Sequence, residues 1–237
     1  MDTGDGDGST TSSRTAMLFE YHINDLLLND CAKNILDTLK SHNHGVGEFL
    51  YKFAGNEIDH NWNVKSADLG IGKVGTTDPP SAYDEENKII TTSFNTPTFR
   101  NSSDLSWVKT ILHESAHAYL ATYFAVNDYN TFNMTYPEMV EQWDELENWN
   151  DVHQEEFARS LKDDIAVILK EFGQMKGYEI HDQYYSDLAW GGLTETSIFD
   201  ELDGADQTRI KNVLSIELTG KDLNGDYKNQ KGCDAGC

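Results

Sequence analysis

Apolar residues recur along the chain at two different spacings, and each spacing predicts one kind of element. Cys31, Ile35 and Leu39 repeat every four residues, as on the buried face of a helix. Comparable patterns predict helices over the following ranges: 25–40, 46–54, 104–125, 137–147, 151–173, 182–190 and 205–218. The chain is therefore expected to be mainly helical from residue 104 onward.

Strict alternation of apolar and polar residues marks two segments in the first half of the chain. Strands are expected over 58–64 and 90–94, and the Gly- and Pro-rich stretch 70–81 is expected to be a loop. Because strands are confined to the first half and helices dominate the second, the pattern predicts an α+β fold. We expect a small, mainly antiparallel sheet in the N-terminal half, packed on a helix-rich C-terminal half.

The start of the chain has a different composition from the rest. Its first residues, MDTGDGDGSTTSSRT, consist almost wholly of Gly, Ser, Thr and Asp, which is typical of a flexible linker. They lack the basic start and apolar stretch of a signal peptide. We expect a flexible linker at 1–17 and a single domain at 18–237, belonging to a longer protein.

The charge balance excludes several classes of partner. The chain has 237 residues, with 18 Lys or Arg and 41 Asp or Glu, and a formal net charge of −23. A nucleic-acid binder needs clustered Lys and Arg, and an anionic membrane also attracts basic residues. No apolar run approaches the roughly 20 residues that a spanning helix needs. We therefore expect no nucleic-acid partner and no membrane insertion.

The strongest chemical signal is the sequence ILHESAHAYL at 111–120, which contains the pattern H-E-x-x-H. Residues four apart lie on one face of a helix, so His113 and His117 are placed to present their imidazoles to one metal ion. Glu114 lies beside this pair and is placed to take a proton from the metal's water. Zinc is the expected ion, since it accepts neutral imidazole ligands.

The helix that carries this motif is expected to be buried. Ser102, Ser103 and Asp104 offer N-cap residues at its start. The helix also has extensive apolar surface, from Trp107, Val108, Ile111, Leu112, Tyr119 and Leu120. A buried helix is where an active-site motif that excludes water would lie.

A catalytic zinc usually has three protein ligands and an open position, so a third ligand is needed. The helix expected at 151–173 has an apolar stripe that includes Phe157, and four residues before Phe157 is His153. His153 is our expected third ligand, because it lies at the end of a core-facing stripe. Glu156 or Glu155, near the same face, is the alternative.

Two other stretches allow both a structural and a functional interpretation. Residues 138–164 are strongly acidic, which indicates a solvated helix face or a surface for a cationic substrate or partner. Asp163 or Asp164 is placed to orient a zinc-bound His. The stretch YYSDLAWGGL at 184–193 indicates a helix end closing over the core, whereas a Tyr there or His181 near zinc would stabilise an oxyanion.

The three cysteines do not form a disulfide framework, because their number is odd and small. Cys233 and Cys237 lie in a Gly-containing tail, and either is able to pair with the other or with Cys31. The sequence leaves open whether any disulfide forms.

Taken together, these motifs resemble those of the zincin metallopeptidases. More narrowly, the chain is similar to the SprT-like zinc peptidase domains of secreted or toxin-bearing bacterial proteins, especially from Bacteroidetes. The similarity covers residues 18–233 and rests on ILHESAHAYL, on HQEEFA at 153–158, and on YYSDLAWGGLTET at 184–196 with Lys-Gly-Cys near the end. The basic elements of SprT-type enzymes that act on DNA-bound proteins are absent from this acidic chain.

The resemblance implies a zincin-like fold and a set of site residues. It implies His113 and His117 as zinc ligands, Glu114 as the general base and His153 as the third ligand. It also implies a small sheet whose edge strand binds an extended substrate backbone.

From the residues and the resemblance we expect a zinc-dependent peptide-bond hydrolase that acts on a protein or peptide. We expect it to be an effector or toxin domain of a larger exported bacterial protein, restrained in the producing cell by an inhibitory immunity protein. The alternatives are a secreted nutritional or processing protease, and a non-catalytic binding module stabilised by zinc. A water at the fourth zinc position marks an enzyme, and a fourth protein ligand marks a structural site.

Overall fold

The computed structural model of the chain describes residues 8–41, 45–54, 59–127, 139 and 154–237. The strands are β1 (Ile23–Leu27), β2 (Asn61–Ala67), β3 (Gly75–Thr77) and β4 (Ile89–Asn95). The α-helices are α1 (Gly8–Tyr21), α2 (Asp30–Ser41), α3 (Gly45–Ala54), α4 (Asp104–Val126), α6 (Gln154–Met175), α7 (Asp182–Leu188), α8 (Ser197–Asp200) and α9 (Gly204–Thr219). Short 3-10 turns at Pro80–Ala82 and Thr96–Asn101 complete the described elements.

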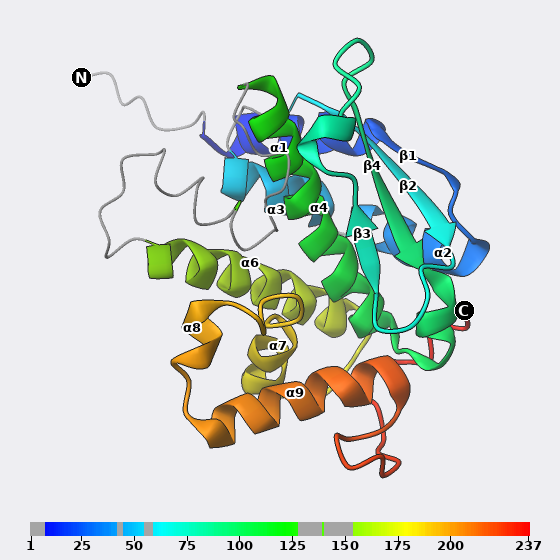
Figure 1. Ribbon diagram of the computed structural model, residues 1–237, viewed down its shortest axis with the longest axis vertical. Coiled ribbons are helices and arrows are strands. Elements are labelled where there is room, and N and C mark those ends of the chain that lie inside the picture. The colour runs from blue at the N-terminus through cyan, green and yellow to red at the C-terminus, as the bar shows by residue number, and fades with distance from the viewer. Residues whose placement is uncertain (1–7, 42–44, 55–58, 128–138, 140–153) are drawn as a thin grey trace.

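The sheet and the C-terminal helices form two separate layers on either side of α4. Figure 1 shows the sheet on one side, with α6, α7, α8 and α9 gathered on the other. α4 packs against β3 and β4 and also against α6 and α9. The strands all precede residue 96 and the later described elements are helical, so the predicted α+β fold is confirmed.

The sheet is mixed, and the prediction of a mainly antiparallel sheet was wrong. Its order is β1-β2-β4-β3, in which β1, β2 and β4 run parallel and β3 runs antiparallel to β4. The reason is the connection between β1 and β2, because α2 and α3 return the chain to the same edge before the next strand begins. Alternation along a single strand carries no information about the direction of its neighbour.

The helix that begins at Gly8 contradicts the predicted linker over the second half of 1–17. α1 is stabilised by tertiary packing, since Ala16 and Phe19 are buried. It packs closely on α3: a Cβ atom at Gly47 would lie 2.1 Å from the Ala16 carbonyl oxygen. A segment of weak helix propensity is therefore helical because its end is buried against a neighbour. Residues 1–7 lie outside the described range.

Two strands were missed by the sequence patterns. β1 occupies the start of the helix predicted at 25–40, which instead begins at Asp30, because the backbone at 23–27 pairs with β2. β3 lies inside the predicted loop at 70–81 and has three residues, too few to show alternation. The other helix predictions within the described residues agree with α3, α4, α6, α7 and α9 to within a few residues. The helix predicted at 137–147, except for Met139, lies outside the described residues.

α4 is buried along most of its length. Ser103 is its N-cap, and its side chain accepts a hydrogen bond from the Ser106 amide, as the cap prediction expected. Nineteen of its 23 residues are buried, so the helix has no solvated face over its central turns. Polar side chains at such positions cost free energy unless they are paired or have a function.

The C-terminal tail is fixed to the start of α4. A disulfide joins Cys31 on α2 to Cys237, and Cys233 is a free, exposed cysteine. The tail also forms backbone hydrogen bonds to the turn before α4, from Asp104 N to Cys233 O and from Ala235 N to Ser102 O. The disulfide and these bonds hold the N-terminal end of α4 in place.

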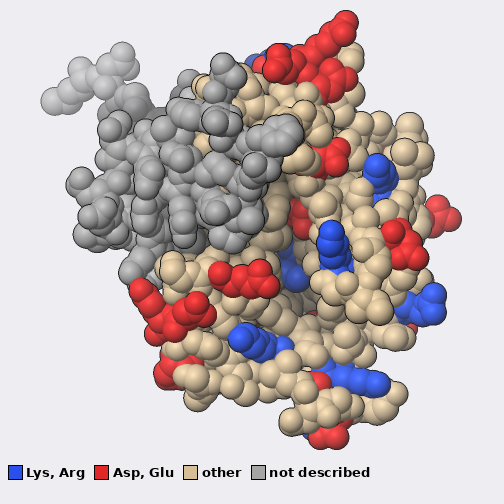
Figure 2. All heavy atoms as spheres, in the orientation of Figure 1, with Lys and Arg blue, Asp and Glu red and all other residues tan. Residues whose placement is uncertain are grey.

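The surface carries charges of both signs. Figure 2 shows Lys and Arg as separate patches among Asp and Glu on the visible described face, without a continuous basic surface. Among the described residues, no helix is long and apolar enough to span a lipid bilayer.

Candidate metal centre

α4 brings the predicted pair of histidines together. The Nε2 atoms of His113 and His117 lie 2.7 Å apart, and the two ring centroids are 4.4 Å apart. One ligand atom from each of His113, Glu114 and His117 lies within 4.8 Å of the others, so this group is able to hold a metal ion. The spacing of four residues on one helix is the cause of this convergence.

Burial keeps both imidazoles in the neutral form that a metal requires. The buried environment lowers the pKa of His113 to about 3, with a further contribution from the positive charge of Lys109. Burial, followed by the effect of His113, holds the pKa of His117 well below its ordinary value. Neutral imidazoles have a free lone pair at neutral pH, so these donors fit a divalent ion such as zinc.

The Glu114 side chain extends from α4 to β3, which is an edge strand of the sheet and is called the edge strand below. Thr77 Oγ1 donates a hydrogen bond to Glu114 Oε2 at 2.8 Å. A Cβ atom at Gly75 would lie 2.7 Å from Glu114 Oε1, so the glycine leaves room for the carboxylate. Burial raises the pKa of Glu114 to about 7, against the opposing effects of the Thr77 hydrogen bond and the Lys109 charge. A carboxylate with a pKa near neutrality is able both to accept and to return a proton.

Three consecutive hydrogen bonds, each donated in the direction of Glu114, support this carboxylate. Trp62 Nε1 donates to Thr92 Oγ1 at 2.8 Å, and the Thr92 and Thr77 hydroxyls lie 2.7 Å apart. An indole nitrogen only donates and an ionised carboxylate only accepts, which fixes the direction from Trp62 through Thr92 and Thr77 to Glu114. Three neighbouring strands, β2, β4 and β3, therefore position the Glu114 side chain.

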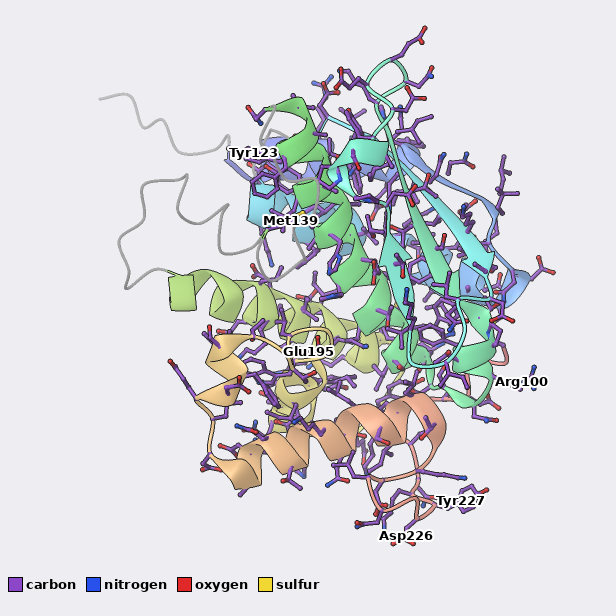
Figure 3. The ribbon with its side chains drawn as sticks, viewed as in Figure 1. Arg100, Tyr123, Met139, Glu195, Asp226 and Tyr227 are labelled. Carbon is purple, nitrogen blue, oxygen red and sulfur yellow. A yellow bond between two sulfur atoms is a disulfide. The ribbon has the colours of Figure 1, made fainter. Side chains whose placement is uncertain are left out.

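The cavity at this group lies between β3 and α4. It has a volume of about 230 Å³, and its lining residues are Gly75, Thr76, Thr77, Asp78, Pro79, Glu114, His117, Ala121 and Met139. Met139 is buried and lies beside α4 in Figure 3. All of the residues of β3 line this cavity. An extended ligand bound there would therefore contact both the edge strand and the group formed by His113, Glu114 and His117.

The turn after α7 forms the opposite wall of the site. Gly192 has a positive φ of 91°, and a Cβ atom there would lie 2.2 Å from His113 Cε1. A Cβ atom at Gly191 would lie 2.4 Å from Lys109 Cδ. The Gly-Gly pair follows the end of α7, as the sequence predicted, and packs directly against Lys109 and His113. Any larger residue at either position would overlap one of these side chains.

The third ligand stays a prediction. His153 lies outside the described residues, and the side chains of Glu155 and Glu156 are also outside them. The later part of the predicted apolar stripe of α6 is confirmed, because Leu161 and Phe172 are buried, as are Ile165 and Ile168 between them. α6 packs on α4, and also on α3 and α7, and the buried stripe belongs to the core that these helices share.

Two other residues considered from the sequence, Tyr184 and Asp163, have structural partners. Tyr184 donates a hydrogen bond to the buried Glu217 at 2.5 Å. His181 precedes α7 and lines a separate cavity with Lys170 and Tyr178. Asp163 forms an ion pair with Lys162 and is largely exposed.

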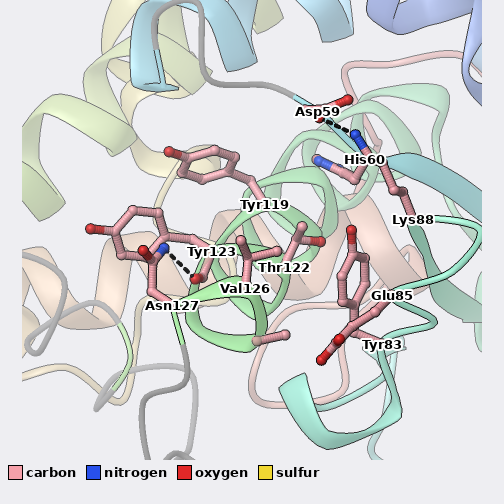
Figure 4. Close-up of a pocket in the computed structure, with 11 residues that line it drawn as sticks. Asp59, His60, Tyr83, Glu85, Lys88, Tyr119, Thr122, Tyr123, Val126 and Asn127 are labelled. Atoms are coloured by element: carbon pink, nitrogen blue, oxygen red, sulfur yellow. Dashed lines mark hydrogen bonds and ion pairs between the residues drawn. The ribbon is translucent and has the colours of Figure 1, made fainter.

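A larger cavity of about 830 Å³ lies further along α4 (Figure 4). His60, Tyr119 and Tyr123 line it, and Asp59 and Lys88 form an ion pair at its wall. His60 is buried, and its Nε2 has no hydrogen-bond partner within the described structure. Burial lowers the pKa of His60 to about 4, so its ring is neutral at pH 7.

Sequence reasoning missed three residues that lie beside the candidate metal centre. Lys109 lies four residues before His113, and this spacing was the available signal, hidden in an apolar run. Thr77 and Gly75 gave no signal, since their role depends on the pairing of β3 with β4.

Comparison with known proteins adds no relatives. No protein-family model matches the chain, and no curated protein or solved structure shows significant similarity to it.

Proposed function

We propose that this protein is a zinc-dependent hydrolase of peptide bonds. The observation that carries the proposal is the convergence of His113 Nε2 and His117 Nε2 beside a buried Glu114 carboxylate held by Thr77. Two neutral imidazoles and one adjacent, oriented carboxylate are the parts that a metal-assisted hydrolase needs from one helix. The resemblance to zincin metallopeptidases supports the same chemistry.

The roles of the side chains follow from their surroundings. His113 and His117 would hold zinc, and the bound ion would supply a Lewis acid for a peptide carbonyl. Glu114 would take a proton from the attacking water and deliver it to the leaving amine. Its pKa of about 7 matches both steps, and the Thr77 hydrogen bond keeps Oε2 in a fixed direction.

The edge strand supports a polypeptide substrate. β3 is the last strand of the sheet, with β4 on one side, and its residues line the cavity beside Glu114. An extended peptide is able to add to such an edge through backbone hydrogen bonds, and these bonds form whatever the side chains of the peptide are. The scissile bond would then lie across the cavity, next to the metal-binding group.

The decisive test joins metal analysis with one substitution. Purified protein is expected to contain one zinc ion per chain, and Glu114→Gln is expected to keep that zinc while losing peptide cleavage by at least about 100-fold. His117→Ala serves as the matched variant that loses both zinc and cleavage. Cleavage by Glu114→Gln at the rate of the unchanged protein would refute the mechanism.

The biological setting stays a prediction from the sequence. An exported effector or toxin domain would require an inhibitory partner, and a nutritional protease would cleave casein broadly. A zinc-bound module without activity would show a fourth protein ligand in place of water.

A further inference from the structure

Lys109 is a buried cation beside the metal-binding group. It lies on α4 one turn before His113, and only 7% of its surface is exposed. Within the described part of the chain, its ammonium group forms no hydrogen bond or ion pair. Lys residues are almost never this buried unless they are paired.

The attraction of the Glu114 carboxylate does not offset the cost of burying the Lys109 charge. Burial lowers the pKa of Lys109 to about 8, which shows that the surroundings disfavour its charge, and the Glu114 charge opposes this shift. A Met side chain has similar length and no charge, so it would fill the same space without the desolvation cost. A buried charge retained beside the candidate metal-binding residues indicates a ligand of opposite charge.

The position of Lys109 relative to His113 follows from the Gly191–Gly192 turn. Gly191 lies against the outer part of the Lys109 side chain, and a Cβ atom there would lie 2.8 Å from Nζ. Gly192, the next residue, lies against the His113 imidazole. Two consecutive residues of one turn therefore contact the Lys109 side chain and the His113 imidazole, which places both side chains against the same wall.

We propose that Lys109 forms a carboxylate subsite of the metal centre. It would bind an ionised carboxyl group of the substrate next to the scissile bond, either the C-terminal carboxylate or an Asp or Glu side chain. This inference rests on the proposed function. An ammonium and a carboxylate form a strong charge-assisted hydrogen bond where water is excluded. In a chain of net charge −23, a substrate carboxylate is repelled at long range, so its recognition needs a dedicated local cation.

The test measures peptide binding in a background without turnover. Zinc-loaded Glu114→Gln protein, with and without Lys109→Met, is titrated calorimetrically with matched peptides. One pair differs in a free or amidated C-terminus, and a second pair differs in Glu or Gln beside the central peptide bond. Lys211→Met, at an exposed position on α9, is the control for loss of a lysine.

We expect Lys109→Met to weaken binding of a carboxylate peptide by about tenfold or more and to change binding of its neutral counterpart less than about twofold. If the affected pair is the one with a free or amidated C-terminus, Lys109 binds the C-terminal carboxylate. If it is the Glu or Gln pair, Lys109 binds a side-chain carboxylate. Thermal unfolding of Lys109→Met is expected to occur at the same or a higher temperature. Equal weakening for all four peptides, or unchanged binding of both carboxylate peptides, would overturn the subsite. Failure of the proposed function would be seen separately, as missing zinc or as undiminished cleavage by Glu114→Gln.

Discussion

At the scale of single residues, the Glu114 carboxylate depends on a hydroxyl from the edge strand. The Thr77 hydrogen bond favours the ionised form of Glu114 and lowers its pKa against the larger effect of burial. The bond also fixes the orientation of Glu114 Oε2. The Thr77 hydroxyl accepts a hydrogen bond from Thr92, which in turn accepts one from Trp62, so the Thr77 hydrogen is left to donate to Glu114.

We predict that Thr77→Val lowers kcat for peptide cleavage by about tenfold. Without the hydrogen bond the pKa of Glu114 rises, so the acid limb of the pH–rate profile moves to higher pH. Thr77→Ser keeps the hydroxyl and is the matched control. A Thr77→Val profile that coincides with that of the unchanged protein would contradict a role for this bond.

His60 makes stability depend on pH in a region away from the metal centre. Its pKa is lowered from 6.5 to about 4 by burial, so the unfolded chain binds more protons than the folded chain between these values. The stability contribution is complete above pH 6.5 and is lost as the pH falls toward 4.

We predict that His60→Phe removes part of this acid sensitivity. Between pH 7 and pH 5, the free energy of unfolding of the unchanged protein should fall by about 2 kcal/mol more than that of the variant. Phe suits the site, because Phe19 and Tyr119 already contact the His60 ring. Urea unfolding at both pH values measures the difference, and parallel losses in the two proteins would exclude His60 as the cause.

At the scale of elements, the Gly191–Gly192 turn and the edge strand hold α4 between them. β3 positions Glu114, and the turn lies against Lys109 and His113. The two walls come from segments more than 100 residues apart in the chain, so the site exists only when the sheet and the C-terminal helices both pack on α4.

We predict that Gly192→Ala lowers zinc affinity by at least about tenfold. The new Cβ atom would overlap the His113 imidazole and force the ring to move. Gly177→Ala is the matched control, since Gly177 also has a positive φ but no atom lies near its missing Cβ. Both variants bear the backbone strain, and zinc titration should separate them. Equal affinities would mean that the turn does not fix His113.

The elements show which parts of this site can be predicted from the sequence. Local patterns located α4, its Ser103 cap and the helical spacing of His113 and His117. They could not locate β3 or the direction of the strands, because these depend on pairing between distant segments. Lys109 was missed for a related reason, since nothing local indicates that its ammonium group would lack a partner.

At the scale of the whole molecule, the disulfide bond between Cys31 and Cys237 closes the chain into a covalent loop. The bonded residues are 206 positions apart, and the tail between Lys231 and Ala235 packs on the start of α4. The buried Glu217 reinforces this contact by accepting hydrogen bonds from the amides of Lys231 and Gly232. The stability of the site helix is thus linked to the state of two cysteines, a pairing that the sequence left open.

We predict that Cys237→Ser lowers the free energy of unfolding by about 2 to 4 kcal/mol, since the unfolded chain is no longer constrained. Cys233→Ser is the control and should have no effect, because Cys233 is free and exposed. Denaturant unfolding measures both variants. If reducing agent left the midpoint of the unchanged protein unaltered, the bond would not contribute to stability.

The exposed loop around Ile71 lies between the two bonded cysteines in the sequence. If a protease nicked this loop, the resulting fragments would stay covalently attached, and an electrophoresis gel run without thiol would show a single band of full mass. Adding a thiol would release two bands. Any search for self-cleavage of this protein therefore has to be made on reduced samples, or a nicked molecule will be taken for an intact one.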